Sequence, residues 1–105
     1  MKYALIGCGR IASNHIKAAL ENNLNIIAVC DINNSQMENL FTKYNLKNDI
    51  KRYNNYKVMI KENEIDLIAI ATESGIHAEI SLYCIKNGIN IIIEKPMAMS
   101  IIDAD

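Results

Sequence analysis

Short apolar runs alternate along the chain with longer segments in which apolar residues recur at helical spacing. The runs are β-prone and bounded by polar residues, which is typical of strands buried in a sheet. Residues 66–72, with the sequence D-L-I-A-I-A-T, form the clearest run, and the run at Ile89–Ile93 also indicates a buried strand. Five strands are expected, at Tyr3–Ile6, Leu24–Cys30, Ile50–Tyr53, Asp66–Thr72 and Ile89–Ile93.

Helical patterns fill the segments between these strands. Asn33–Ser35 offers an N-cap for one helix, and Gly88 is expected to end another as its C-cap. The first helix is expected to bury a face made of Ile11, His15, Ala18 and Ala19. Helices are expected at Arg10–Asn22, around Met37–Tyr44, at Tyr56–Asn63, at Gly75–Asn87 and from Ser100 onward. This alternation favours an α/β fold with a doubly wound parallel sheet, Rossmann-like, and helices on both faces.

The first strand runs through two glycines straight into a helix, with the sequence G-C-G-R-I-A. This is the layout of a turn that binds the pyrophosphate of a dinucleotide. Gly7 permits a sharp turn, Gly9 permits close approach of the phosphates, and Ala12 lets the helix pack on the strand. The helix N-terminus adds free N–H groups and a partial positive charge. The candidate cofactor-binding residues of this turn are Gly7, Gly9, Arg10, Ile11 and Ala12.

An acidic residue stands where the second strand is expected to end. Asp31 lies 31 − 12 = 19 positions after Ala12, close to the spacing of about 20 in the dinucleotide pattern. A carboxylate there can accept hydrogen bonds from both ribose hydroxyls. The 2′-phosphate of NADP would meet the same negative charge, and residues 32–34 include no Arg or Lys to pair with it, so NAD is favoured. The glycine pattern alone is weak evidence, because glycines after strands are common.

Composition narrows the class of protein. The chain has 105 residues, of which 50% are hydrophobic and 22% are charged, so a single globular domain is expected. A formal net charge of −1 without a basic block disfavours nucleic acid as a partner, and the apolar runs are too short for a membrane span. Cys8, Cys30 and Cys84 lack metal-ligand spacing, so we expect no metal and interpret them as reduced residues of a cytoplasmic protein.

Three separate stretches carry a resemblance to a known family. They are Gly7–Ala12, Ala71–Glu79 (A-T-E-S-G-I-H-A-E) and Glu94–Ala98 (E-K-P-M-A), each at the carboxyl end of an expected strand. In this order they resemble the Gfo/Idh/MocA oxidoreductases, which include glucose–fructose oxidoreductase, inositol dehydrogenase and nucleotide-sugar dehydrogenases. The resemblance covers all 105 residues. One departure is Glu73, which stands where the family more usually has a proline.

The resemblance implies NAD(P)-dependent oxidation of a sugar, nucleotide-sugar or polyol alcohol, or the reverse reduction. It places Asp31 at the ribose, and it places Thr72 and His77 at the border of the dinucleotide. Glu94 and Lys95 match the segment beside the nicotinamide ribose and the substrate. Lys95 is the catalytic candidate, which would act on the reacting hydroxyl. The resemblance thus extends the candidate cofactor-binding set to Asp31, Thr72, His77, Glu94 and Lys95.

The resemblance also implies a longer enzyme. The family continues with a sixth strand and a second α/β domain, which carries most of the substrate pocket, a catalytic Asp/His pair and the oligomer interface. Residues 1–105 are therefore interpreted as the dinucleotide-binding domain of a homo-oligomeric enzyme, truncated before that strand and that domain. The strand Ile89–Ile93 is then expected to present an open apolar edge. Pro96 matches a position that is often cis in the family.

The site residues also have ordinary structural interpretations. His77 could be no more than a first-turn helix residue, and Lys95 could be a solvated lysine at a strand end. His15 is interpreted as a histidine of the core. Two other functions remain open, namely a non-catalytic NAD-binding regulatory module and a methyltransferase-like fold. The segment Glu94–Pro96 argues against the second of these.

Overall fold

The structure is a computed structural model that describes residues 1–9, 12–72 and 74–93. Strands and helices alternate along these residues, as the hydrophobic pattern predicts. The strands are β1 (Lys2–Ile6), β2 (Asn25–Cys30), β3 (Lys51–Tyr53), β4 (Leu67–Ile70) and β5 (Asn90–Ile93). The helices are α1 (Ala12–Glu21), α2 (Asn34–Tyr44), α3 (Tyr56–Glu62) and α4 (Ser74–Lys86). The helix expected from Ser100 onward lies outside the described residues.

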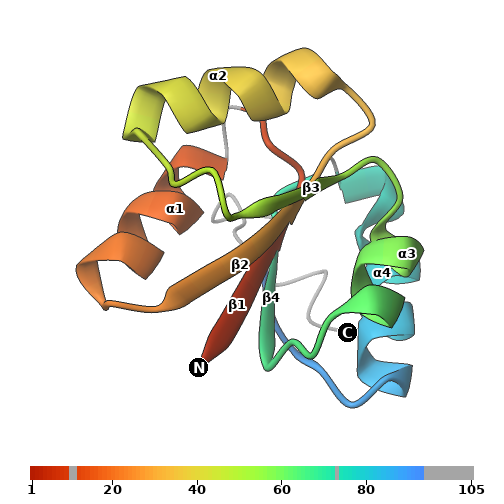
Figure 1. Ribbon diagram of the computed structural model, residues 1–105. Coiled ribbons are helices and arrows are strands. Elements are labelled where there is room, and N and C mark those ends of the chain that lie inside the picture. Colours follow the sequence, from red (N-terminus) through yellow and green to blue (C-terminus); the bar gives the residue numbers. More distant parts are fainter. Residues whose placement is uncertain (10–11, 73, 94–105) are drawn as a thin grey trace.

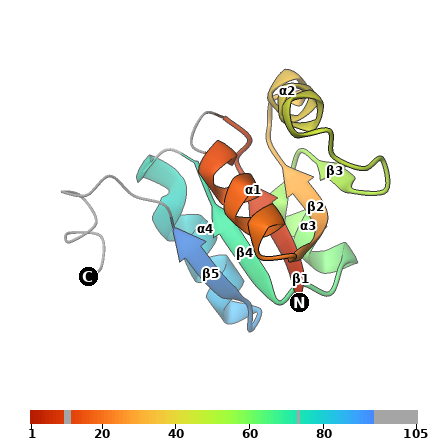
Figure 2. The same cartoon turned by 90° about the vertical axis from the view of Figure 1, so that its left-hand side faces the viewer.

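The described strands form one parallel sheet in the order β3-β2-β1-β4-β5. The chain builds outward from β1 to β3, and then crosses to the other side of β1 to add β4 and β5. Helices α1 and α2 cover one face of the sheet, and α3 and α4 cover the other (Figure 1, Figure 2). The doubly wound α/β fold with helices on both faces is therefore confirmed.

The core consists of two apolar layers with the sheet between them. Tyr3 and Leu5 of β1 pack into the layer beneath α1 and α2, whereas Ala4 and Ile6 pack into the layer beneath α3 and α4. All four side chains are buried. Because β1 is covered on both faces, its sequence is a continuous apolar run rather than an alternation of apolar and polar residues.

Strand β5 is only half covered, which corrects the expectation that Ile89–Ile93 is a buried strand. Ile92 is 43% exposed and Asn90 is also exposed, whereas Ile91 and Ile93 pack into the layer of α3 and α4. The physical reason is position, because β5 has a neighbouring strand on one side only within the described sheet. The open edge agrees with the sequence prediction for this strand, whereas the exposure of Ile92 does not.

Local signals for the helices are mostly accurate. Asn33 caps α2, where its side chain accepts the N–H of Ser35 at 2.9 Å, and Gly88 follows α4 with a φ of +73°. The buried face of α1 differs from the expected one, because Ala18 is exposed. That face follows the i, i+3, i+4, i+7 spacing and consists of Ala12, His15, Ile16 and Ala19.

No helix in the described part of the chain has the length and apolar character that crossing a membrane requires.

Candidate functional site

The strands end in register along one edge of the sheet. Ile6 at the end of β1 lies opposite Cys30 of β2 and Ile70 of β4. Cys30 in turn lies opposite Tyr53 at the end of β3. The residues that follow these strands therefore stand beside one another at the carboxyl edge, where open α/β sheets bind ligands. They are Gly7, Asp31, Asn54 and Ala71.

Gly7 is required by the fold itself. Its φ is +95°, and its N–H donates to the carbonyl oxygen of Cys30 at 2.7 Å. A Cβ on Gly7 would lie 2.8 Å from the carbonyl carbon of Ala71 and 2.9 Å from the nitrogen of Thr72. Contacts that short do not occur between real side chains and backbone, so the glycine turn lies directly against the loop after β4.

Gly9, unlike Gly7, lies next to open space. A Cβ built on it would meet no described atom within 4 Å. Its carbonyl oxygen accepts the N–H of Ala12 at 3.0 Å, where α1 begins, and Ala12 is fully buried in the core. The missing side chain at Gly9 therefore leaves open space near the start of α1 rather than relieving a contact within the protein.

The Asp31 carboxylate connects the glycine turn to the loop after β2. Its Oδ2 accepts the N–H of Cys8 at 2.7 Å, and its Oδ1 accepts the N–H of Asn33 at 2.8 Å. The sequence spacing predicts a ligand contact at Asp31 and gives no indication of these two bonds. A carboxylate oxygen has more than one lone pair, so both oxygens could still accept a hydroxyl group.

Asn54 belongs to the same cluster, although the sequence analysis does not single it out. Its Nδ2 donates to the carbonyl oxygen of Asp31 and to Oδ1 of Asn34, both at 2.8 Å. The N–H of Asp31 donates in turn to the carbonyl oxygen of Tyr53 at 2.9 Å. The signal that could have found Asn54 is its position directly after the third strand, at the same sheet edge as Asp31.

Thr72 and His77 lie together beyond the end of β4. His77, in the first turn of α4, donates a short hydrogen bond from Nε2 to the carbonyl oxygen of Thr72. Because a carbonyl can only accept, this bond places the ring proton at Nε2. The Thr72 hydroxyl is buried and has no hydrogen-bond partner within the described residues. Buried hydroxyls are seldom left without a partner, so this one is a candidate for a bond to a group outside the described residues.

Comparison with known proteins identifies the family of the chain. The chain matches, over residues 1–105, the model GFO_IDH_MocA, an oxidoreductase family with an NAD-binding Rossmann fold. The chain belongs to this family. The resemblance of its motifs to the Gfo/Idh/MocA oxidoreductases is thereby confirmed, and so is NAD as the cofactor of the domain.

Individual members of the family resemble the chain in sequence and in structure. The chain is 26% identical to inositol 2-dehydrogenase of Salmonella paratyphi B over 105 residues, which cover 98% of this chain and 31% of that protein. Myo-inositol 2-dehydrogenase from Lactobacillus plantarum superposes with a TM-score of 0.79 and 31% identity, over 91% of this chain and 28% of that one. The WlbA dehydrogenase from Bordetella pertussis, in complex with NADH and UDP-GlcNAcA, gives 0.78 and 25%, over 90% and 28%. The chain thus spans about a third of the length of the relatives it matches.

The described residues of this Gfo/Idh/MocA chain fit a dinucleotide at the carboxyl edge. The space beside Gly9 is open where phosphates would need close approach to the backbone. The Thr72 hydroxyl is buried with no partner among the described residues, and the Asp31 oxygens keep lone pairs that their two N–H donors do not use. These three features come from β1, β2 and β4, which are neighbours in the sheet.

The thiols near the site are chemically inert. Burial, followed by the negative charge of Asp31, raises the pKa of Cys8 and of Cys30 to about 12. Both therefore stay protonated at neutral pH, and neither acts as a nucleophile. Cys84 is also free and buried. No cluster of three His, Cys, Asp or Glu that could hold a metal ion exists among the described residues.

The remaining candidate residues fall into two groups. His15 is 5% exposed on the buried face of α1, and its carbonyl oxygen accepts the hydroxyl of Tyr3 at 3.3 Å, in agreement with its interpretation as a core histidine. The others lie outside the described residues, namely Arg10, Ile11, Glu73, Glu94, Lys95 and Pro96.

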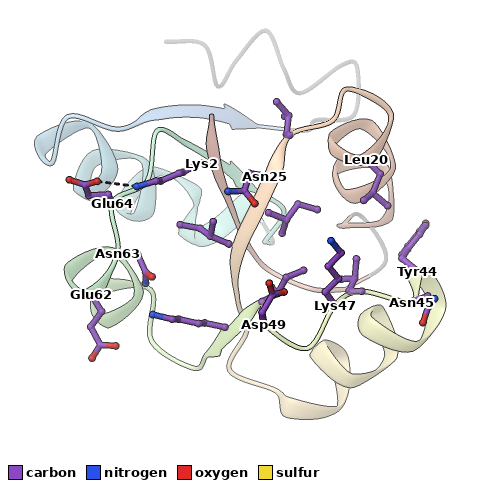
Figure 3. A pocket seen from close by; sticks show the side chains of 16 residues that line it. Lys2, Leu20, Asn25, Tyr44, Asn45, Lys47, Asp49, Glu62, Asn63 and Glu64 are labelled. Atoms are coloured by element: carbon purple, nitrogen blue, oxygen red, sulfur yellow. Dashed lines mark hydrogen bonds and ion pairs between the residues drawn. The ribbon is translucent and has the colours of Figure 1, made fainter.

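A groove of about 700 Å³ opens at the opposite edge of the sheet (Figure 3). Its lining includes the first residues of three strands, Lys2, Asn25 and Lys51, together with the loop after α2. Lys2 forms an ion pair there with Glu64 at 3.0 Å. The groove shares no lining residue with the carboxyl edge, so it is not part of the candidate site.

Proposed function

We propose that this chain is the NAD-binding part of an oxidoreductase that transfers a hydride between the nicotinamide and the carbinol carbon of a sugar, nucleotide-sugar or polyol. The observation that carries the proposal is the arrangement of the glycine turn, Asp31 and Thr72 at the carboxyl edge of the sheet. The similar proteins support the substrate class, because inositol is a polyol and UDP-GlcNAcA is a nucleotide-sugar.

In this proposal the glycine turn holds the pyrophosphate. The open space beside Gly9, near the start of α1, supports this assignment. Asp31 accepts the hydroxyls of the adenosine ribose on the lone pairs that Cys8 and Asn33 leave free. The residues of the turn that take part are Gly7, Gly9, Arg10, Ile11 and Ala12.

The nicotinamide side is assigned to residues after β4 and β5. Thr72 and His77 border the dinucleotide, and the hydrogen bond from His77 fixes the Thr72 carbonyl and orients the imidazole ring. β5 ends at Ile93, which lies opposite Ile70 in the sheet register. This register supports a place for Glu94 and Lys95 beside the nicotinamide ribose and the substrate.

Lys95 is the proposed catalytic residue. NAD supplies the hydride acceptor of the reaction. The ammonium group of Lys95 would polarise the reacting hydroxyl and assist its deprotonation, a role that is typically worth about 10²–10⁴-fold in rate. The substrate then needs only to present a carbinol carbon toward the nicotinamide, which agrees with a family that takes both cyclic polyols and nucleotide-sugars.

We further propose that residues 1–105 act as the dinucleotide-binding domain of a longer, homo-oligomeric, cytoplasmic enzyme. The chain corresponds to 31% of inositol 2-dehydrogenase, so a further domain for the substrate and the oligomer interface is consistent with that relationship. Three free cysteines fit a reducing compartment.

Turnover by the complete gene product tests the proposal. The protein is incubated with NAD and a panel of inositols, free sugars and nucleotide-sugars, and the absorbance of the reduced cofactor is followed. We expect turnover of at least one compound, and we expect Lys95→Met to lower kcat by at least about a hundredfold with little change in the Kd for NAD. NAD binding without turnover of any compound would support a regulatory module instead. An unchanged kcat with weaker NAD binding would assign Lys95 to the cofactor.

A further inference from the structure

We infer that Asn54 is a positioning residue, which holds the Asp31 carboxylate where the adenosine ribose needs it; this inference rests on the proposed function. Asn54 is the first residue after β3, and one side-chain nitrogen makes both of its contacts. That nitrogen donates to the carbonyl oxygen of Asp31 and to Oδ1 of Asn34, each at 2.8 Å. An amide nitrogen carries two hydrogens, so both are used.

The two bonds fix both ends of the loop that carries the carboxylate. Asp31 directly follows β2, and Asn34 is the first residue of α2. The N–H of Asp31 is already bonded to the carbonyl oxygen of Tyr53 at 2.9 Å, and Asn54 adds a bond to the carbonyl oxygen on the other side of the same residue. Tyr53 of β3 and the following residue, Asn54, therefore hold the Asp31 backbone from both sides.

The orientation of the carboxylate depends on this backbone. Oδ2 reaches the N–H of Cys8 at 2.7 Å and Oδ1 reaches the N–H of Asn33 at 2.8 Å, so both oxygens are aligned between the glycine turn and the loop. A group that binds a ribose diol has to be held within about 0.5 Å of its productive position. If the loop samples other conformations, the apparent affinity equals the intrinsic affinity multiplied by the fraction of molecules that remain competent.

Removing the Asn54 side chain should weaken cofactor binding and leave the stability of the fold unchanged. Its side chain is exposed and belongs to neither apolar layer of the core. The neighbouring residue offers a matched control, because Asn55 caps α3 by accepting the N–H of Lys57 at 2.8 Å and makes no contact with the Asp31 loop among the hydrogen bonds of the described residues. The two adjacent asparagines thus make different contacts, Asn54 with the Asp31 loop and Asn55 with the first turn of α3.

Calorimetric titration with NAD and with NADP tests the inference, and the melting temperature is measured in parallel. The proteins compared are wild type, Asn54→Ala, Asn54→Asp and Asn55→Ala. We expect Asn54→Ala to weaken NAD binding by about three- to tenfold and to weaken NADP binding less, so that the preference for NAD narrows at an unchanged melting temperature. Asn54→Asp, which can only accept, should lose both bonds and weaken NAD binding at least as much as Asn54→Ala. Asn55→Ala should lower the melting temperature and keep the preference.

The outcomes separate this inference from the proposed function. Failure of wild type to bind NAD would overturn both. If wild type binds NAD and both Asn54 variants bind it with the wild-type affinity, the positioning role alone would be overturned. An equal loss of affinity for the two cofactors together with a lower melting temperature would make Asn54 a merely structural residue. If Asn54→Ala does not fold, Asn34→Ala removes one of the two bonds, and a preference equal to that of wild type would then contradict the inference.

Discussion

The backbone N–H of Cys8 donates a 2.7 Å hydrogen bond to Oδ2 of Asp31, which joins the turn after β1 to the loop after β2. The other carboxylate oxygen accepts the N–H of Asn33 at 2.8 Å. One side chain therefore fixes the pyrophosphate turn and faces the place proposed for the ribose. The two halves of the proposed adenosine diphosphate site are therefore not independent, because both would depend on the charge and geometry of Asp31.

Asp31→Asn should destabilise the ligand-free protein, although the two residues have nearly the same shape. The amide oxygen can accept from Cys8 or from Asn33, and the amide NH₂ then faces the other N–H. We expect the free energy of unfolding to fall by about 1–2 kcal/mol, measured by urea denaturation. Asp66→Asn is the matched control, because within the described residues one donor, the N–H of Lys2, bonds to the Asp66 carboxylate, at 2.8 Å, and an amide oxygen can still accept it. Equal stability of Asp31→Asn and wild type would contradict the double role.

The two glycines of the turn should respond in opposite ways to alanine. Gly7→Ala combines a positive φ with a Cβ 2.8 Å from the Ala71 backbone, so it should cost at least about 2 kcal/mol of stability. Gly9→Ala meets no described atom within 4 Å, so its stability should stay within about 0.5 kcal/mol of wild type. Its Kd for NAD should nevertheless rise more than tenfold, because the methyl group occupies space proposed for the phosphates. Thermal unfolding and calorimetric titration measure the two effects. NAD affinity at the wild-type level in Gly9→Ala would exclude the pyrophosphate from this position.

Thr72→Val tests the buried hydroxyl that finds no hydrogen-bond partner in the described part of the chain. Valine has the same shape and removes a desolvated polar group, so the ligand-free protein should be as stable as wild type or more stable. NAD affinity should fall by about five- to tenfold if the hydroxyl bonds to the cofactor. Thr42→Val is the control, since the Thr42 hydroxyl already donates to the carbonyl oxygen of Glu38 on α2. A destabilised Thr72→Val with normal affinity would mean that the hydroxyl serves the fold.

Stability should decline at alkaline pH. Burial raises the pKa of Cys8 and Cys30 from 9.0 to about 12 and that of Cys84 to about 11. The unfolded chain therefore releases these protons first, so the contribution of the thiols is complete below about pH 9 and is lost as pH rises toward the folded values. Urea denaturation at pH 7.5, 9 and 10 should show a progressively lower free energy of unfolding. Cys84→Ala, with one such thiol fewer, should show a shallower decline, and a flat profile up to pH 10 would show that the thiols are not buried as described.

The sequence predicts the order of strands and helices because buried parallel strands are continuous apolar runs, as at Tyr3–Ile6. It predicts Asp31 because the acid stands at a fixed spacing from the glycine turn. It does not predict the hydrogen bond between Asp31 and Cys8. The side chain of Asp31 comes close to the backbone N–H of the turn after β1 only when the two strands pair in the sheet. Asn54 is missed because it follows a short, weakly apolar strand and belongs to no periodic pattern. The exposure of Ile92 is missed because burial depends on what covers a strand and not on its composition.

The central claim is that Asp31 lies at the adenosine ribose of NAD, and the relative affinity for NAD and NADP tests it most directly. The 2′-phosphate of NADP carries about −1.5 to −2 charges and would meet the carboxylate directly. Calorimetric titration of both oxidised cofactors at moderate salt should give a Kd for NAD at least about tenfold lower, a difference of about 1.4 kcal/mol. The difference should shrink in Asp31→Ala. Equal affinities of the wild-type protein for NAD and NADP would show that Asp31 is not at the ribose.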